Sequence, residues 1–89
     1  MHSPPDGMLD VIGSGAHVGS FAIRAFITQH EPLVTLHGHI HETVMMTGRF
    51  MEKNGRAVCL APGNNPHHDK LALVVLDANN PKDAKRYLV

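Results

Sequence analysis

The stretch Leu33-Val34-Thr35-Leu36-His37-Gly38-His39-Ile40-His41-Glu42 joins a short apolar run to a loop that carries three histidines. The first four residues have the length and the β-prone composition of a buried strand, and Gly38 marks its end. Imidazole is the commonest side-chain metal ligand, and only one residue separates His39 from His41. Gly38 is expected to let the backbone turn sharply, so that both rings converge on one small volume. The alternative is a strand that merely displays two histidines on one face.

Composition limits the possible functions. The chain has 89 residues, which predicts a single domain over residues 1–89. Eight Lys and Arg offset eight Asp and Glu, so no net charge attracts nucleic acid or an anionic membrane, and neither is expected as a partner. Cys59 is the only cysteine, which excludes an internal disulfide and favours a reducing compartment, with the cytoplasm as the expected location. The sequence has no run of 18 apolar residues and no signal-peptide pattern at its start.

The first half of the chain predicts a loop and a helix before the strand at 33–36. Residues 2–19 are rich in Gly, Pro, Ser and Asp, which indicates a functional loop. Residues 20–30 are predicted to form an amphipathic helix with Ser20 as its N-cap and Pro32 just beyond its end. The expected apolar face consists of Phe21, Ile23, Ala25, Phe26 and Ile27.

The second half predicts three or four strands. Asn54-Gly55 is a strong hairpin signal between candidate strands at 47–51 and 56–61. Residues 62–66 break the chain, and the unbroken apolar run at 71–76 suits a central strand. After a turn at 77–81, Pro81 suits the start of a helix, whereas residues 86–89 suit an edge strand; the strand is favoured.

Four segments occur in an order typical of a known family. They are His2-Ser3-Pro4-Pro5, His17-Val18-Gly19-Ser20 before the predicted helix, the Gly38-His39-Ile40-His41 motif, and Ala61-Pro62-Gly63 before the last apolar run. Together they span nearly the whole chain, which resembles the C-terminal part of a calcineurin-like metallophosphoesterase. The resemblance implies an α/β fold in which one main helix packs on a small mixed β-sheet, equivalent to the C-terminal portion of that family's α/β sandwich.

The resemblance also implies an activity and a set of metal ligands. His2 and His39 match the ligands of one cation, and His41 matches a ligand of the other. The implied function is metal-dependent hydrolysis of a phosphoester at a two-metal centre. Mixed His, Asp and Asn ligation suits Mn, Fe or Zn better than Ca.

The main departure from the family pattern concerns the carboxylate ligands. The family's Asp-x-His, Gly-Asp and Asn-His elements would precede His2, and Asp6 and Asp10 cannot be matched to them because they follow it. Two cations about 3.5 to 4 Å apart need a bridging anionic ligand, which three neutral imidazoles do not supply. We therefore expect either an incomplete piece of a longer gene product or a missing half supplied in trans.

Two consequences follow for partners and function. One face of the sheet should be poorly covered, which predicts a homo-oligomer or a missing N-terminal segment. The alternative function is a catalytically silent domain that binds one metal or a protein partner.

Other residues near the motifs have simpler interpretations. His37 is expected to be structural or to support a ligand. Glu42 suits two roles equally, orienting the His41 ring through its second nitrogen or lying in solvent. His17 is interpreted as a solvent-facing loop residue, although a place in the substrate cleft stays open.

Two further features are expected to be inert. His67 and His68 point apart as neighbours in a turn-rich segment, so they are predicted to be simply exposed. Cys59 lies in an apolar candidate strand and is predicted to be a buried, unreactive thiol.

Overall fold

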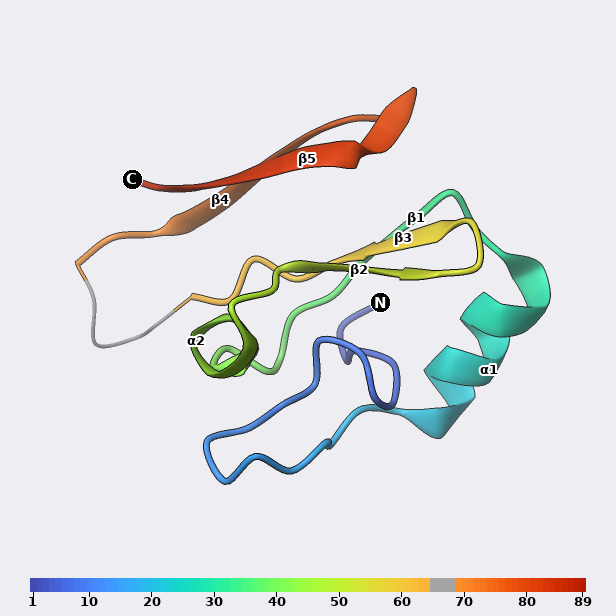
Figure 1. The fold of residues 1–89 in the computed structure, drawn as a ribbon, viewed down its shortest axis with the longest axis horizontal. Helices are drawn as coiled ribbons and strands as arrows, with labels where there is room; N and C mark the ends of the chain where they lie inside the picture. Colours follow the sequence, from blue (N-terminus) through green and yellow to red (C-terminus); the bar gives the residue numbers. More distant parts are fainter. Residues whose placement is uncertain (65–68) are drawn as a thin grey trace.

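The computed structural model describes residues 1–64 and 69–89, which form two helices and two small β-sheets (Figure 1). The elements are α1 (Phe21–His30), β1 (Val34–Leu36), α2 (Thr43–Thr47), β2 (Met51–Asn54), β3 (Ala57–Leu60), β4 (Ala72–Asp77) and β5 (Asn80–Leu88). The predicted α/β class is confirmed, with the strands divided between two sheets. No helix in the described part of the chain is long and apolar enough to span a lipid bilayer.

Strand β3 is the centre of the fold. It pairs in parallel with β1 and antiparallel with β2, and all of its residues are buried. Its side chains alternate between two hydrophobic clusters: Ala57 and Cys59 belong to one, and Val58 and Leu60 to the other. This alternation, which follows from the two-residue period of a strand, places a core on each face of the three-stranded sheet.

Helix α1 and the N-terminal loop cover one face of that sheet. Ile27 is fully buried in the cluster around Cys59, together with Met8 and Leu9 of the loop. The predicted N-cap is confirmed, because the Ser20 hydroxyl accepts a hydrogen bond from the backbone N–H of Ile23 at 3.2 Å. The buried stripe is narrower than the predicted apolar face.

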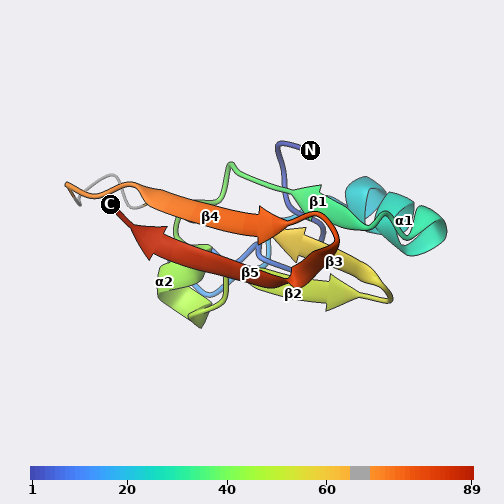
Figure 2. The same cartoon turned by 90° about the horizontal axis from the view of Figure 1, so that it is seen from above.

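The β4–β5 hairpin covers the other face, as Figure 2 shows from above. Val74 and Leu76 pack with Ala84 against the cluster of Val58 and Leu60. The prediction of a central strand at 71–76 is wrong, because among the described strands β4 pairs with β5 alone and its side chains alternate between inner and exposed positions. The favoured strand at the C-terminus is confirmed and begins earlier than expected, at Asn80.

The expected poorly covered sheet face is absent from the three-stranded sheet, since both of its faces carry a hydrophobic cluster. Exposed apolar side chains lie elsewhere. On the hairpin they include Leu73 and Val75, and on α1 they include Phe21 and Phe26.

The β2–β3 hairpin forms where Asn54-Gly55 predicted it. Asn54 pairs with Ala57, so the connection is the two residues Gly55 and Arg56. The predicted strand at 47–51 is wrong over most of its length, because Thr43–Thr47 forms α2. Gly48 ends this helix with a φ of 72° and donates its N–H to the carbonyl of Val44 at 2.7 Å, so β2 begins only at Met51.

Candidate metal centre

The backbone of the histidine loop turns at His39. The φ of His39 is 65°, and the N–H of Ile40 donates to the carbonyl of Gly38 at 2.7 Å, which closes a γ-turn of the rare positive-φ form. The predicted sharp turn therefore exists, but its position is corrected from Gly38 to His39. A Cβ at Gly38 would meet only ordinary van der Waals contacts.

The N-terminal residues run beside the end of β1. The Gly38 N–H donates to the carbonyl of His2 at 2.7 Å, and the amino group of Met1 donates to the carbonyl of Leu36 at 3.0 Å. Pro4 and Pro5 follow in buried positions. These contacts bring His2 to the histidine loop although 37 positions separate it from His39.

His2 and His39 meet side chain to side chain. The Nε2 of His2 lies 3.3 Å from the Nδ1 of His39, and the two rings are tilted by 67° with their centroids 5.0 Å apart. Both residues are exposed, so solvent reaches the pair. One nitrogen donates to the other in this arrangement, and the tautomers decide which one.

His41 lies exposed just before α2 and does not complete a cluster with these rings. Within residues 1–64 and 69–89 there is no group of three or more His, Cys, Asp or Glu side chains that could hold a metal ion. The structure thus brings together two of the three predicted ligands. His67 and His68 lie outside the described residues.

His37 is buried beneath the loop. Its Nδ1 donates to the carbonyl of Ser3 at 3.0 Å, which leaves its Nε2 to accept from the hydroxyl of Thr35 at 2.7 Å. Burial lowers the pKa of His37, which favours this neutral form. His37 therefore holds Ser3 in place, and Ser3 is the neighbour of His2 in the chain.

Glu42 is exposed and makes no side-chain capping hydrogen bond to α2. Among the described residues its carboxylate makes no hydrogen bond to a histidine either. Its two interpretations, orienting the His41 ring or lying in solvent, both stay predictions.

Asp10 and His17 form a pair that the sequence interpretation missed. Asp10 is fully buried, and one of its carboxylate oxygens accepts the N–H groups of Gly7 and Gly19 at 2.8 and 2.9 Å. The other oxygen lies 2.6 Å from the Nδ1 of His17, whose side chain is 53% exposed. No local pattern marks this pair, because six loop residues separate its members and it forms only when the loop closes.

The contact between Asp10 and His17 shifts the pKa values of both side chains. Burial alone raises the pKa of Asp10, but the hydrogen bonds from His17, Gly19 and Gly7 outweigh it and hold the pKa below its ordinary value. The hydrogen bond and charge of Asp10 raise the pKa of His17.

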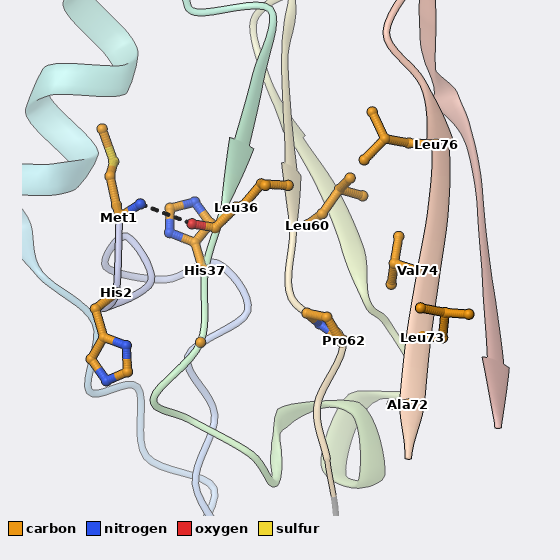
Figure 3. A pocket seen from close by; sticks show the side chains of 11 residues that line it. Met1, His2, Leu36, His37, Leu60, Pro62, Ala72, Leu73, Val74 and Leu76 are labelled. Carbon is orange, nitrogen blue, oxygen red and sulfur yellow. Dashed lines mark hydrogen bonds between the residues drawn. The ribbon is translucent and has the colours of Figure 1, made fainter. Parts of the chain in front are cut away.

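A largely apolar cavity of about 400 Å³ opens beside His2 (Figure 3). Met1 and His2 lie on one side of it and the side chains of β4 on the other, with Leu60 and Pro62 between them. The apolar lining includes Leu36, Leu73 and Val74. The cavity thus places a hydrophobic surface next to one of the paired imidazoles.

Comparisons with protein-family models, with curated proteins and with solved structures found no match to this chain. The resemblance to metallophosphoesterases therefore rests on the motifs quoted above.

Proposed function

We propose that this chain contributes histidine ligands to a divalent-metal centre that hydrolyses phosphoesters, with His2 and His39 binding the same cation. The observation that carries the proposal is the distance of 3.3 Å between His2 Nε2 and His39 Nδ1. The proposal also rests on the order of the motifs around these residues.

The distance fits a shared cation. Two nitrogen ligands at about 2.0 to 2.1 Å from a tetrahedral Zn²⁺ lie about 3.3 to 3.4 Å apart. Both imidazoles are exposed, so packing does not prevent the ring rotations that coordination requires. Mn, Fe and Zn all accept imidazole nitrogen, and the pair does not choose among them.

The remaining residues supply position and binding surface. His37 holds Ser3, and through it the neighbouring His2, while the γ-turn fixes the backbone at His39. The apolar cavity beside His2 suits the organic group of a phosphoester, and His41 is the proposed ligand of a second cation. When bound, the cations would polarise the phosphoryl group and activate the attacking water. The anionic ligands that such a centre needs would come from another polypeptide segment.

A second candidate is a catalytically silent domain that binds one metal ion or a protein partner. It is favoured by the absence of a third metal-ligating side chain beside the histidine pair in the described residues. Two imidazoles with water completing the coordination shell hold one cation but not a bridged pair.

Metal titration with elemental analysis, combined with hydrolysis of an aryl phosphodiester, tests the proposal. Replacing His2 or His39 with Gln should weaken Zn²⁺ binding at least about tenfold, since even losing a group that supports a ligand has effects of that size. His30→Gln is the matched control, because His30 lies exposed at the end of α1.

The outcomes separate the two candidates. Two metals per active unit with turnover support the enzyme, whereas one metal or none without turnover supports the silent domain. Zn²⁺ binding that survives both substitutions would refute the shared-cation site. We retain the cytoplasm as the proposed location, since Cys59 is an unpaired thiol.

A further inference from the structure

A second hollow, of about 320 Å³, lies away from the histidine pair and is lined by His17, Arg49 and Glu52. Backbone and side chains of Gly7, Leu9, Val11 and Thr47 complete its wall. Its size is at the lower end of the range of small-molecule sites. None of the proposed metal ligands lines it.

Most polar groups in this wall already have partners. The N–H groups of Gly7 and Leu9 donate to Asp10 and Glu52, each at 2.8 Å. The Thr47 hydroxyl donates to the carbonyl of Thr43 at 2.8 Å. Within residues 1–64 and 69–89, the donors left over are the Nε2 of His17, when protonated, and the guanidinium of Arg49, whose one ion pair there is a long 3.5 Å contact with Glu52.

The most exposed charges in this hollow are positive. The side chains of His17 and Arg49 are 53% and 69% exposed, whereas those of Asp10 and Glu52 are 0% and 25% exposed. Although the chain has no net charge, the two cations in this wall are therefore more exposed than the Glu52 carboxylate that lines it with them.

We propose that the hollow between His17 and Arg49 is a binding site for a tetrahedral oxyanion of the phosphate class. The Nε2–H of the His17 imidazolium and the Arg49 guanidinium donate to the anion, and both bonds are charge-assisted. Asp10 holds the His17 ring through Nδ1, so Nε2 is the nitrogen left for the ligand. This site is separate from the proposed metal centre and does not depend on it.

A neighbouring hollow extends the positive surface. It shares Gly7, Arg49 and Glu52 with the first and adds Arg24 and Lys53 to the wall. These cations raise the local positive potential around Arg49, which favours an anionic solute.

Binding should follow the protonation of His17. The charged groups facing His17 are Asp10 and Asp6 of its own loop, Glu52 of β2 and Arg49. The three carboxylates favour the imidazolium, with the hydrogen bond to Asp10 dominant, so the pKa of His17 is raised. Anion affinity is therefore expected to fall as the pH rises through this raised pKa.

The test is a sulfate titration of the full 89-residue chain followed by NMR, with EDTA present to remove metal ions. Sulfate is the probe because its charge does not change between pH 5 and 9; inorganic phosphate is then compared at pH 6. His17→Gln and Arg49→Gln should each weaken sulfate binding about tenfold at pH 6. Arg56→Gln is the matched control, because Arg56 is 73% exposed and also has one long ion pair, at 3.9 Å to Glu31.

The pH profile separates a direct contact from a structural effect. The effect of His17→Gln should disappear by pH 9, whereas that of Arg49→Gln should persist. If His17→Gln does not fold, the pH dependence of sulfate binding to the wild type and the comparison of Arg49→Gln with Arg56→Gln still test the proposal. The proposal is overturned if sulfate leaves the resonances of His17 and Arg49 unmoved, or if Arg49→Gln binds sulfate as tightly as Arg56→Gln.

Discussion

The Nδ1 of His17 lies 2.6 Å from Oδ1 of the fully buried Asp10 carboxylate, so an exposed ring and a buried charge form one pair. The same carboxylate accepts two backbone N–H groups of the loop. The pair thereby joins the closure of the N-terminal loop to the protonation of a surface side chain.

Stability should depend on pH at both ends of this pair. The pKa of Asp10 is lowered in the fold, so its contribution is complete above its ordinary value of 3.8 and is lost as the pH falls through the folded pKa. The pKa of His17 is raised, so its contribution is complete below 6.5 and is lost as the pH rises through the folded pKa. The melting temperature of His17→Gln should thus be below that of the wild type at pH 5 and equal to it at pH 9. An equal difference at both pH values would contradict this linkage.

Removing the carboxylate itself should have a larger effect. Asp10→Ala removes a buried carboxylate and leaves the N–H groups of Gly7 and Gly19 without their acceptor at a partly buried site, which costs about 2 kcal/mol of unfolding free energy. Urea denaturation measures the loss, with the exposed carboxylate change Asp83→Ala as control. A loss below about 1 kcal/mol would mean that water satisfies these donors.

Gly19 has no room for a side chain. A Cβ at this position would lie 2.3 Å from the carbonyl oxygen of Pro5, so Gly19→Ala must push the two loop segments apart. We expect a destabilisation of about 2 to 3 kcal/mol in chemical denaturation. Gly13→Ala is the control, because nothing lies within 4 Å of its Cβ position, and it should be neutral or slightly stabilising. Equal effects of the two changes would refute the close approach.

Ile27 should account for most of the docking energy of α1. It is fully buried against the cluster around Cys59, so Ile27→Ala should cost about 2 to 5 kcal/mol. Phe26→Ala removes more atoms from the neighbouring position, but 46% of Phe26 is exposed and the cost should be below about 1.5 kcal/mol. Thermal unfolding of both variants checks the order, and a larger loss for Phe26→Ala would place the buried face of α1 elsewhere.

The backbone conformation of His39 should lower the stability of the metal-free chain, while its imidazole serves the proposed metal site. Its left-handed backbone costs an L-residue about 1 to 2 kcal/mol, which glycine avoids apart from its larger entropy in the unfolded chain. His39→Gly should therefore hold or raise the melting temperature of the metal-free chain while weakening Zn²⁺ binding. His41→Gly, at a position without positive φ, should lower the melting temperature. A clear loss of stability in His39→Gly would show that the turn carries no strain.

Local signals predicted the parts of this fold that local chemistry decides. Ser20 marked the start of α1, and Asn54-Gly55 marked the hairpin, because a cap and a two-residue turn depend on neighbours in sequence. The position of β4 depends on long-range pairing. Its exposed Leu73 and Val75 are as apolar as its inner residues, so the run 71–76 looked like a strand buried on both sides.

The candidate sites divide in the same way. The histidine motifs identified His2 and His39, and the structure brings these two rings together from opposite ends of the first 39 residues. The partnership of Asp10 with His17 arises from the closure of the N-terminal loop, and the wall that Arg49 completes arises from how that loop lies against residues 47–52. No spacing rule in the sequence encodes them.

The full burial of the Cys59 thiol in β3 makes it a reporter of local unfolding of this protein. A thiol-labelling reagent can reach the sulfur only when α1 and the loop lift away from β3, so the labelling rate reports how often that happens. Since burial also raises the pKa of this thiol, the closed molecule should remain unlabelled for as long as its layers stay together.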